Sequence, residues 1–207
     1  LEDHGFSWAA SGESVFRHSM AHPANKDIAD KGLYQGFRVG DGRLACFFRD
    51  DGLSDLIGFT YSDWHADDAV NNLIQHLDNI ADSTRNQPAA LVSIILDGEN
   101  AWEHFPENGY HFLNTLYKRL ADHPGINMTT YSDYLQTARC QPSLKQLVSG
   151  SWVYGTFSTW IGDTDKNRGW EMLIDAKRAF DQTVAEDSLD SEALLAAQHQ
   201  LSICEGS

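Results

Sequence analysis

The sequence predicts an α/β fold over residues 1–135, followed by a helical region over residues 136–207. Three observations support this prediction: short apolar runs, amphipathic helical patterns between them, and a change of character near residue 135. Strands that alternate with helices form βαβ units around a parallel sheet. An open sheet and part of a closed barrel both fit this pattern. A chain of 207 residues, 42% of them hydrophobic, can bury a hydrophobic core large enough for such a fold.

The expected strands are apolar or extended runs. "RLACFF" (43–48) and "LVSIIL" (91–96) are nearly continuous apolar stretches, which is typical of parallel strands covered on both faces. "INMTTY" (126–131) is the third extended stretch. The expected order is therefore strand, helix, strand, helix, strand.

Two amphipathic helices are expected between these strands. Over residues 67–82 the apolar side chains recur at helical spacing, and Asp67 and Asp68 lie at the favourable N-terminal end. Over residues 107–123 a leucine-rich stripe has the same spacing, and Pro124-Gly125 ends the pattern. Both helices should cover a sheet with their apolar faces.

The C-terminal part is expected to be mostly helical. Residues 132–148 carry two short helical patterns, "SDYLQTARC" and "PSLKQLVSG". A loop rich in Gly, Ser and Trp follows over residues 149–163, and two longer helices are expected over 165–186 and 190–203.

Composition excludes some classes of partner. A formal charge of −15 opposes the phosphate neutralisation that nucleic-acid binding requires, so no nucleic-acid partner is expected. No apolar stretch approaches the roughly 20 residues that span a bilayer, so no membrane partner is expected. The three cysteines are far apart and form no C-x-x-C pair, which favours a reduced, cytoplasmic setting. Six tryptophans suit either sugar binding or core packing.

Asp97 is the leading candidate for catalysis. It directly follows the apolar run 91–96, and side chains just past strand ends line the ligand crevice of parallel α/β folds. Glu99 can accept hydrogen bonds that hold the loop, and Trp102 can supply an apolar wall. An indole beside a carboxylic acid disfavours the ionised form, which suits a proton donor. Alternatively, the two acids cap the following turn and Trp102 fills the core.

Two further features have alternative interpretations. Oxygen and imidazole ligands for a metal are available, although helix capping explains Asp67 and Asp68 without one. The set is Asp63, His65, Asp67, Asp68, Asp97 and Glu99. The aromatic loop 149–163 can bring flat rings to a ligand, or it can clamp the helical part onto the sheet.

Three long segments resemble glycoside hydrolase family 57, particularly its amylopullulanase-like and α-amylase-like members. They are "FFRDDGLSDLIGFTYSDW" (47–64), "LDGENAWEHFPENGYHFLNTLYKRL" (96–120) and "GSWVYGTFSTWIGDTDKNRGWEML" (150–173). The segments occur in the order of the family, and together they span residues 47–173, which is most of the chain. The resemblance implies a retaining α-glycosidase or 4-α-glucanotransferase that acts on α-1,4 glucans, with α-1,6 linkages as the alternative, and that needs no cofactor.

The resemblance also implies a fold and a set of site residues. The fold would be part of an incomplete (β/α)7 barrel, followed by a helical region that closes over the site. Asp97 would match the general acid/base of the family. The substrate-binding residues that the resemblance implies are Glu99, Trp102, Trp152, Trp160 and Asn167.

Retaining hydrolysis needs a second carboxylate, a nucleophile about 5 Å from the acid. In the family this glutamate lies upstream of the stretch that resembles "GFSWAASGESVF" (5–16), and only four residues precede Gly5 here. Glu13 is the nearest acid, but its surroundings match the segment after the nucleophile. We therefore expect an internal fragment that is inactive by itself. A metal-dependent carbohydrate deacetylase or mannosidase and a non-catalytic glucan-binding protein are the competing interpretations.

Overall fold

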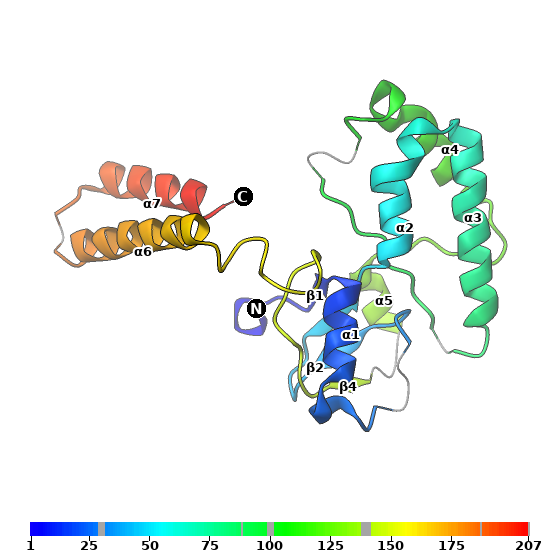
Figure 1. The fold of residues 1–207 in the computed structure, drawn as a ribbon, viewed down its shortest axis with the longest axis horizontal. Helices are drawn as coiled ribbons and strands as arrows, with labels where there is room; N and C mark the ends of the chain where they lie inside the picture. The colour runs from blue at the N-terminus through cyan, green and yellow to red at the C-terminus, as the bar shows by residue number, and fades with distance from the viewer. Residues whose placement is uncertain (29–31, 88, 99–101, 138–141, 187, 207) are drawn as a thin grey trace. The chain divides into compact units, whose positions relative to one another are not determined.

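The computed structural model describes residues 1–28, 32–87, 89–98, 102–137, 142–186 and 188–206 (Figure 1). The chain divides into two compact units, Leu1–Thr156 and Phe157–Ser207. The predicted boundary after residue 135 falls within the first unit, and the division into domains there stays a prediction. None of the described helices is long and apolar enough to cross a membrane.

The first unit contains an open, four-stranded mixed sheet. Its strands are β1 (Trp8–Ser11), β2 (Phe37–Val39), β3 (Ala45–Phe48) and β4 (Ser143–Leu144), in the order β1-β3-β2-β4. The pairs β1/β3 and β2/β4 are parallel, whereas β2/β3 is antiparallel. The expected α/β class is therefore confirmed, but an all-parallel sheet is not present among the described residues.

Strand β3 is the predicted apolar run 43–48, and it is buried on both faces. The helix α1 (Glu13–Ala21) covers one face, where the rings of Phe16 and Phe48 lie 4.9 Å apart. The helix α5 (Tyr131–Thr137) covers the other, where the rings of Phe47 and Tyr131 stack at 4.2 Å. Alternation of side chains along the strand explains why neighbouring residues enter different cores.

Two other expected strands do not join the sheet. Residues 91–96 form neither a helix nor a strand, and their backbone groups bond to a loop and to side chains: the amide of Asp50 donates to the carbonyl of Ser93 at 2.8 Å. Residues 126–130 also form neither a helix nor a strand, and they lead directly into α5. An apolar run specifies burial, and it does not specify which partner satisfies its backbone.

The expected short helix at "PSLKQLVSG" is also wrong. Ser143 and Leu144 form β4 instead, and the amide of Gly40 donates to the carbonyl of Leu144 at 2.7 Å. The Leu144 side chain is fully buried beneath α1. Tertiary pairing with a strand more than one hundred residues earlier therefore overrides the local helical pattern.

The longer helices are confirmed. The predicted helix 67–82 is α3 (Ala66–Ser83), and the predicted helix 107–123 is α4 (Tyr110–Ala121). These two pack with α2 (Asp51–Asp55) and the helical turns after it into a second apolar core beside the sheet (Figure 1).

The second unit contains two helices that lie side by side, α6 (Thr164–Ala185) and α7 (Ser191–Glu205) (Figure 1). They match the helices expected over 165–186 and 190–203. Asp163 and Asp190 cap their N-termini by accepting hydrogen bonds from backbone amides in the first turn.

Candidate active site

The carboxyl ends of β1 and β3 meet at one edge of the sheet. The strands are parallel and in register, so that Ser11 lies opposite Phe48. The next residues begin two helices: Glu13 opens α1 and Asp51 opens α2. The Asp51 amide donates to Oε2 of Glu13 at 3.1 Å, which joins the two strand ends directly. Strand ends of this kind line the ligand crevices of α/β proteins.

Arg49 is the central side chain of this strand-end edge. Only 8% of the residue is exposed. Its guanidinium donates to Oδ1 of Asp51 at 2.8 Å and to Oδ1 of Asp55 at 2.6 Å. Burial alone would lower the pKa of Arg49, but the hydrogen bonds and charges of Asp55 and Asp51 outweigh it and raise the pKa. The buried cation is therefore paired on two sides.

Asp50 connects the same edge to two neighbouring segments. Its Oδ1 accepts from the amide of Leu53 at 2.8 Å and so caps α2, while Oδ2 accepts from the Tyr34 hydroxyl at 2.9 Å. Burial, followed by the hydrogen bond and the charge of Asp50, raises the pKa of Tyr34. Both oxygens of this nearly buried carboxylate are thus used for structure.

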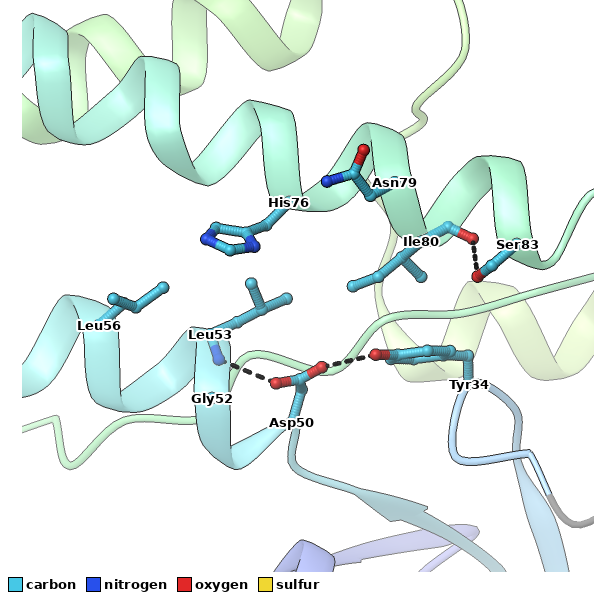
Figure 2. A pocket seen from close by; sticks show the side chains of 9 residues that line it. All are labelled: Tyr34, Asp50, Gly52, Leu53, Leu56, His76, Asn79, Ile80 and Ser83. Atoms are coloured by element: carbon cyan, nitrogen blue, oxygen red, sulfur yellow. Dashed lines mark hydrogen bonds between the residues drawn. The ribbon is translucent and has the colours of Figure 1, made fainter.

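A cavity of about 570 Å³ lies between α2 and α3, next to this Asp50–Tyr34 pair (Figure 2). Leucine and isoleucine side chains form its apolar part, and His76 and Asn79 point into it from α3. Its lining residues are Tyr34, Asp50, Gly52, Leu53, Leu56, His76, Asn79, Ile80 and Ser83. None of the site residues predicted from the sequence is among them.

Asp97 lies exposed at the end of the segment 91–98. Two residues before it, both backbone groups of Ile95 are held by side chains from the β3–α2 region. The Ile95 amide donates to Oγ of Ser54 at 3.2 Å, and its carbonyl accepts from Nε of Arg49 at 3.0 Å. The segment that carries Asp97 is therefore fixed to the strand-end edge. Glu99, the predicted neighbour of Asp97, lies outside the described residues.

Trp102 packs into the helical core. Its ring centroid lies 5.4 Å from that of Phe105 and 6.1 Å from that of Phe112. Gly109 approaches the same ring so closely that an added Cβ would lie 2.9 Å from it. This arrangement supports the core-filling interpretation of Trp102, and its predicted contact with sugar stays a prediction.

Trp152 lies at the strand-end edge. The guanidinium carbon of Arg49 is 5.6 Å from the centre of its indole, and 45% of the residue is exposed. Gly12 packs against its backbone, because an added Cβ would lie 2.8 Å from Cα of Trp152. The fold thus brings Trp152, a predicted sugar-binding residue, next to Arg49, which also holds the segment that carries Asp97.

Trp160 and Asn167 belong to the second unit, which is described by itself. Oδ1 of Asn167 accepts from the amide of Gly162 at 2.9 Å and closes the turn before α6. The carbonyl of Trp160 accepts from the indole of Trp170 at 3.0 Å. Asn167 therefore shapes the aromatic loop, while sugar contacts of either residue stay predictions.

His65, one of the candidate metal ligands, caps a helix with its side chain. Nδ1 of His65 accepts from the amide of Asp67 at 3.3 Å and caps α3. Within the ranges that the structure describes, no three His, Cys, Asp or Glu side chains are grouped to hold a metal ion.

The sequence matches the family described as glycosyl hydrolase family 57 over residues 1–146. The chain belongs to this family. A comparison with curated proteins found no match.

Solved structures of family 57 enzymes share the fold. A branching enzyme from Pyrococcus horikoshii aligns over 87% of this chain and 39% of its own, with a TM-score of 0.68 and 14% identity. A branching enzyme from Thermococcus kodakaraensis, in complex with glucose and additives, aligns over 87% of this chain and 41% of its own (TM-score 0.65, 14% identity).

A 4-α-glucanotransferase from Thermococcus litoralis aligns over 88% of this chain and 27% of its own, with a TM-score of 0.59 and 19% identity. This family 57 chain therefore spans well under half the length of each of these three structures.

Sequence reasoning did not identify Arg49, Ser54 or Asp55 as site residues. The available signal was "RDD" directly after the buried run 43–48, the same strand-end position that singled out Asp97. What the pattern could not supply was the contact between Arg49 and a carbonyl 46 residues later.

Proposed function

We propose that this family 57 chain is the acid-bearing part of a retaining α-glucan hydrolase or glucanotransferase. The position of Asp97 carries the proposal. Asp97 is exposed and follows a segment that Arg49 anchors to the edge of the sheet where β1 and β3 end. The family match over residues 1–146 includes Asp97. In the same proposal, β1 and β3 are neighbouring strands of an incomplete (β/α)7 barrel.

The reaction would proceed by double displacement. A glutamate nucleophile attacks the anomeric carbon while Asp97 gives its proton to the departing glycosidic oxygen. Asp97 then takes a proton from water or from an acceptor sugar, whose oxygen displaces the glutamate. Water yields hydrolysis and a sugar hydroxyl yields transfer. Trp152, exposed beside Arg49, would present its ring to a pyranose face.

Glu13 is not the proposed nucleophile. Its carboxylate is already engaged, because it accepts from the amide of Asp51 at 3.1 Å and from Nε of Arg17 at 2.8 Å. The nucleophile in this proposal is a glutamate outside this chain, as the family resemblance implies.

The test uses the full-length product of the gene and maltooligosaccharides. Asp97→Asn should lower kcat by roughly 100- to 10,000-fold, because general acid/base catalysis contributes factors of that size. Azide should restore turnover of an activated substrate, since azide attacks the glycosyl-enzyme without needing a base. The matched control is Asp122→Asn, an exposed acid at the end of α4.

An undiminished rate in Asp97→Asn would refute the acid/base role. Activity that depends on stoichiometric zinc would support the metal-dependent deacetylase or mannosidase instead. Binding of glycogen without any change in its structure would support a non-catalytic glucan-binding protein.

A further inference from the structure

We infer that Arg49 is a positioning residue that holds the Asp97 segment in place for the proton-transfer step. The inference rests on the proposed function of Asp97. It adds a residue for which the sequence predicted no role, and it assigns the residue to a step of the reaction.

The segment that leads to Asp97 is held by side chains. A strand is normally fixed by a ladder of backbone hydrogen bonds, but residues 91–96 do not belong to the sheet. Near its end, Ile95 depends on two side chains, Ser54 on its amide and Arg49 on its carbonyl. Ser54 is fully buried and Arg49 is nearly so. The last described anchor before Asp97 is therefore a pair of side chains rather than a neighbouring strand.

The guanidinium of Arg49 has the planar, forked shape that these contacts need. It donates in three directions at once: to Asp51, to Asp55 and to the Ile95 carbonyl. These bonds are 2.6–3.0 Å long and they fix the plane of the group. An ammonium is a compact charge that cannot reproduce this fork, so lysine would keep the charge and lose the geometry.

Trp152 lies against the same guanidinium. The indole lies 5.6 Å from the guanidinium carbon of Arg49, within the range of a cation–π contact. The same side chain therefore touches an exposed aromatic ring and the backbone that leads to the acid. A displacement of Arg49 would move the sugar-facing ring and the proton donor relative to each other, and small displacements of reacting groups cost large factors in rate.

A purely structural Arg49 would have a different signature. If it only stabilised the fold, its replacement would lower activity on every substrate by the same factor. If Arg49 positions Asp97, the rate should fall mainly on substrates whose leaving group must be protonated. A glycosyl fluoride makes this distinction, because fluoride departs without protonation and the bond to the anomeric carbon breaks without help from Asp97.

The experiment compares Arg49→Lys, Ser54→Ala and Asp97→Asn in the full-length gene product. Two rates are measured: kcat on maltooligosaccharides and the initial burst of fluoride from α-maltosyl fluoride. We expect Arg49→Lys to lose roughly 10- to 100-fold on maltooligosaccharides and less than about threefold in the burst. Ser54→Ala releases the other side of Ile95 and should show the same selective loss, to a smaller extent. The control is Arg85→Lys, because Arg85 forms an exposed ion pair with Asp82.

The outcomes separate the two proposals. If Asp97→Asn loses maltooligosaccharide activity selectively while Arg49→Lys loses both rates equally or neither, Arg49 is not a positioning residue and the role of Asp97 stands. If Asp97→Asn keeps full activity on both substrates, the proposed function fails and the inference for Arg49 fails with it. Should Arg49→Lys not fold, a loss in Ser54→Ala that is equal on both substrates would also overturn the inference.

Discussion

Replacement of Asn25 should destabilise the first unit strongly. This residue is fully buried after α1, and its side chain holds a segment 121 residues away. Its Nδ2 donates to the carbonyl of Ser19 at 2.7 Å and to the carbonyl of Gln146 at 2.7 Å, while its Oδ1 accepts from the amide of Gln146 at 3.2 Å. The Gln146 segment leads into the aromatic loop that contains Trp152.

The magnitude follows from these three bonds. Each intramolecular hydrogen bond contributes about 1 kcal/mol net, so Asn25→Ala should lower the free energy of unfolding by about 3 kcal/mol. For a chain of this size, that loss corresponds to a fall in Tm of roughly 6–12 °C. Asn25→Asp should be at least as harmful, because an ionised carboxylate cannot donate to the carbonyls of Ser19 and Gln146.

Urea denaturation, followed by tryptophan fluorescence, measures this change. The slope m should be the same in all variants, which shows that each exposes the same surface area on unfolding. The matched control is Asn127→Ala, because Asn127 is exposed before α5. If Asn25→Ala costs less than about 1 kcal/mol, or no more than the control, the three hydrogen bonds of Asn25 do not anchor Gln146 to the end of α1.

Three further predictions concern buried residues of the first unit. Gly12→Ala should cost about 1–3 kcal/mol in urea denaturation, because its Cβ would lie 2.8 Å from Cα of Trp152 and the backbone must shift; Gly169→Ala, which meets open space, should cost nothing. Burial raises the pKa of Cys46 to about 12, so at pH 8 iodoacetamide should modify exposed Cys204 and spare Cys46 in peptide mass mapping. Because the Cys46 thiol keeps its proton to a higher pH in the folded state than in the unfolded state, the free energy of unfolding should fall above about pH 8.5. Equal labelling of Cys46 and Cys204 would contradict the burial argument.

The sequence predicted elements whose hydrophobic pattern is complete within one short segment. The helix α3 follows from apolar side chains at helical spacing, and its observed bounds differ from the predicted ones by one residue at each end. The strand β3 follows from a run that is buried on both faces. In both elements the apolar positions of the segment match the faces that the fold buries.

Contacts that are distant in sequence could not be predicted in the same way. The two residues of β4 are too few to show a strand pattern, and their partner β2 lies about one hundred residues earlier. The run 91–96 has the composition of a strand, but the donors and acceptors that satisfy it come from Asp50, Ser54 and Arg49. Composition specifies that such a segment is buried, while the identity of its partner is a property of the whole fold.

The same distinction explains what could be predicted about the candidate site. Asp97 was identified because an acid directly after a buried run is a local signal. Its setting is not local: Arg49, 48 residues earlier in the numbering, holds the carbonyl of Ile95 and lies against Trp152, which is more than one hundred residues later. Burial of the Arg49 guanidinium costs free energy unless its hydrogen bonds to Asp51 and Asp55 have good geometry. The same fixed group contacts the Ile95 carbonyl and the Trp152 ring, so it connects separate segments of the chain. The proposed proton donor can therefore be located from one segment, whereas the residue inferred to position it can be located only from the folded chain.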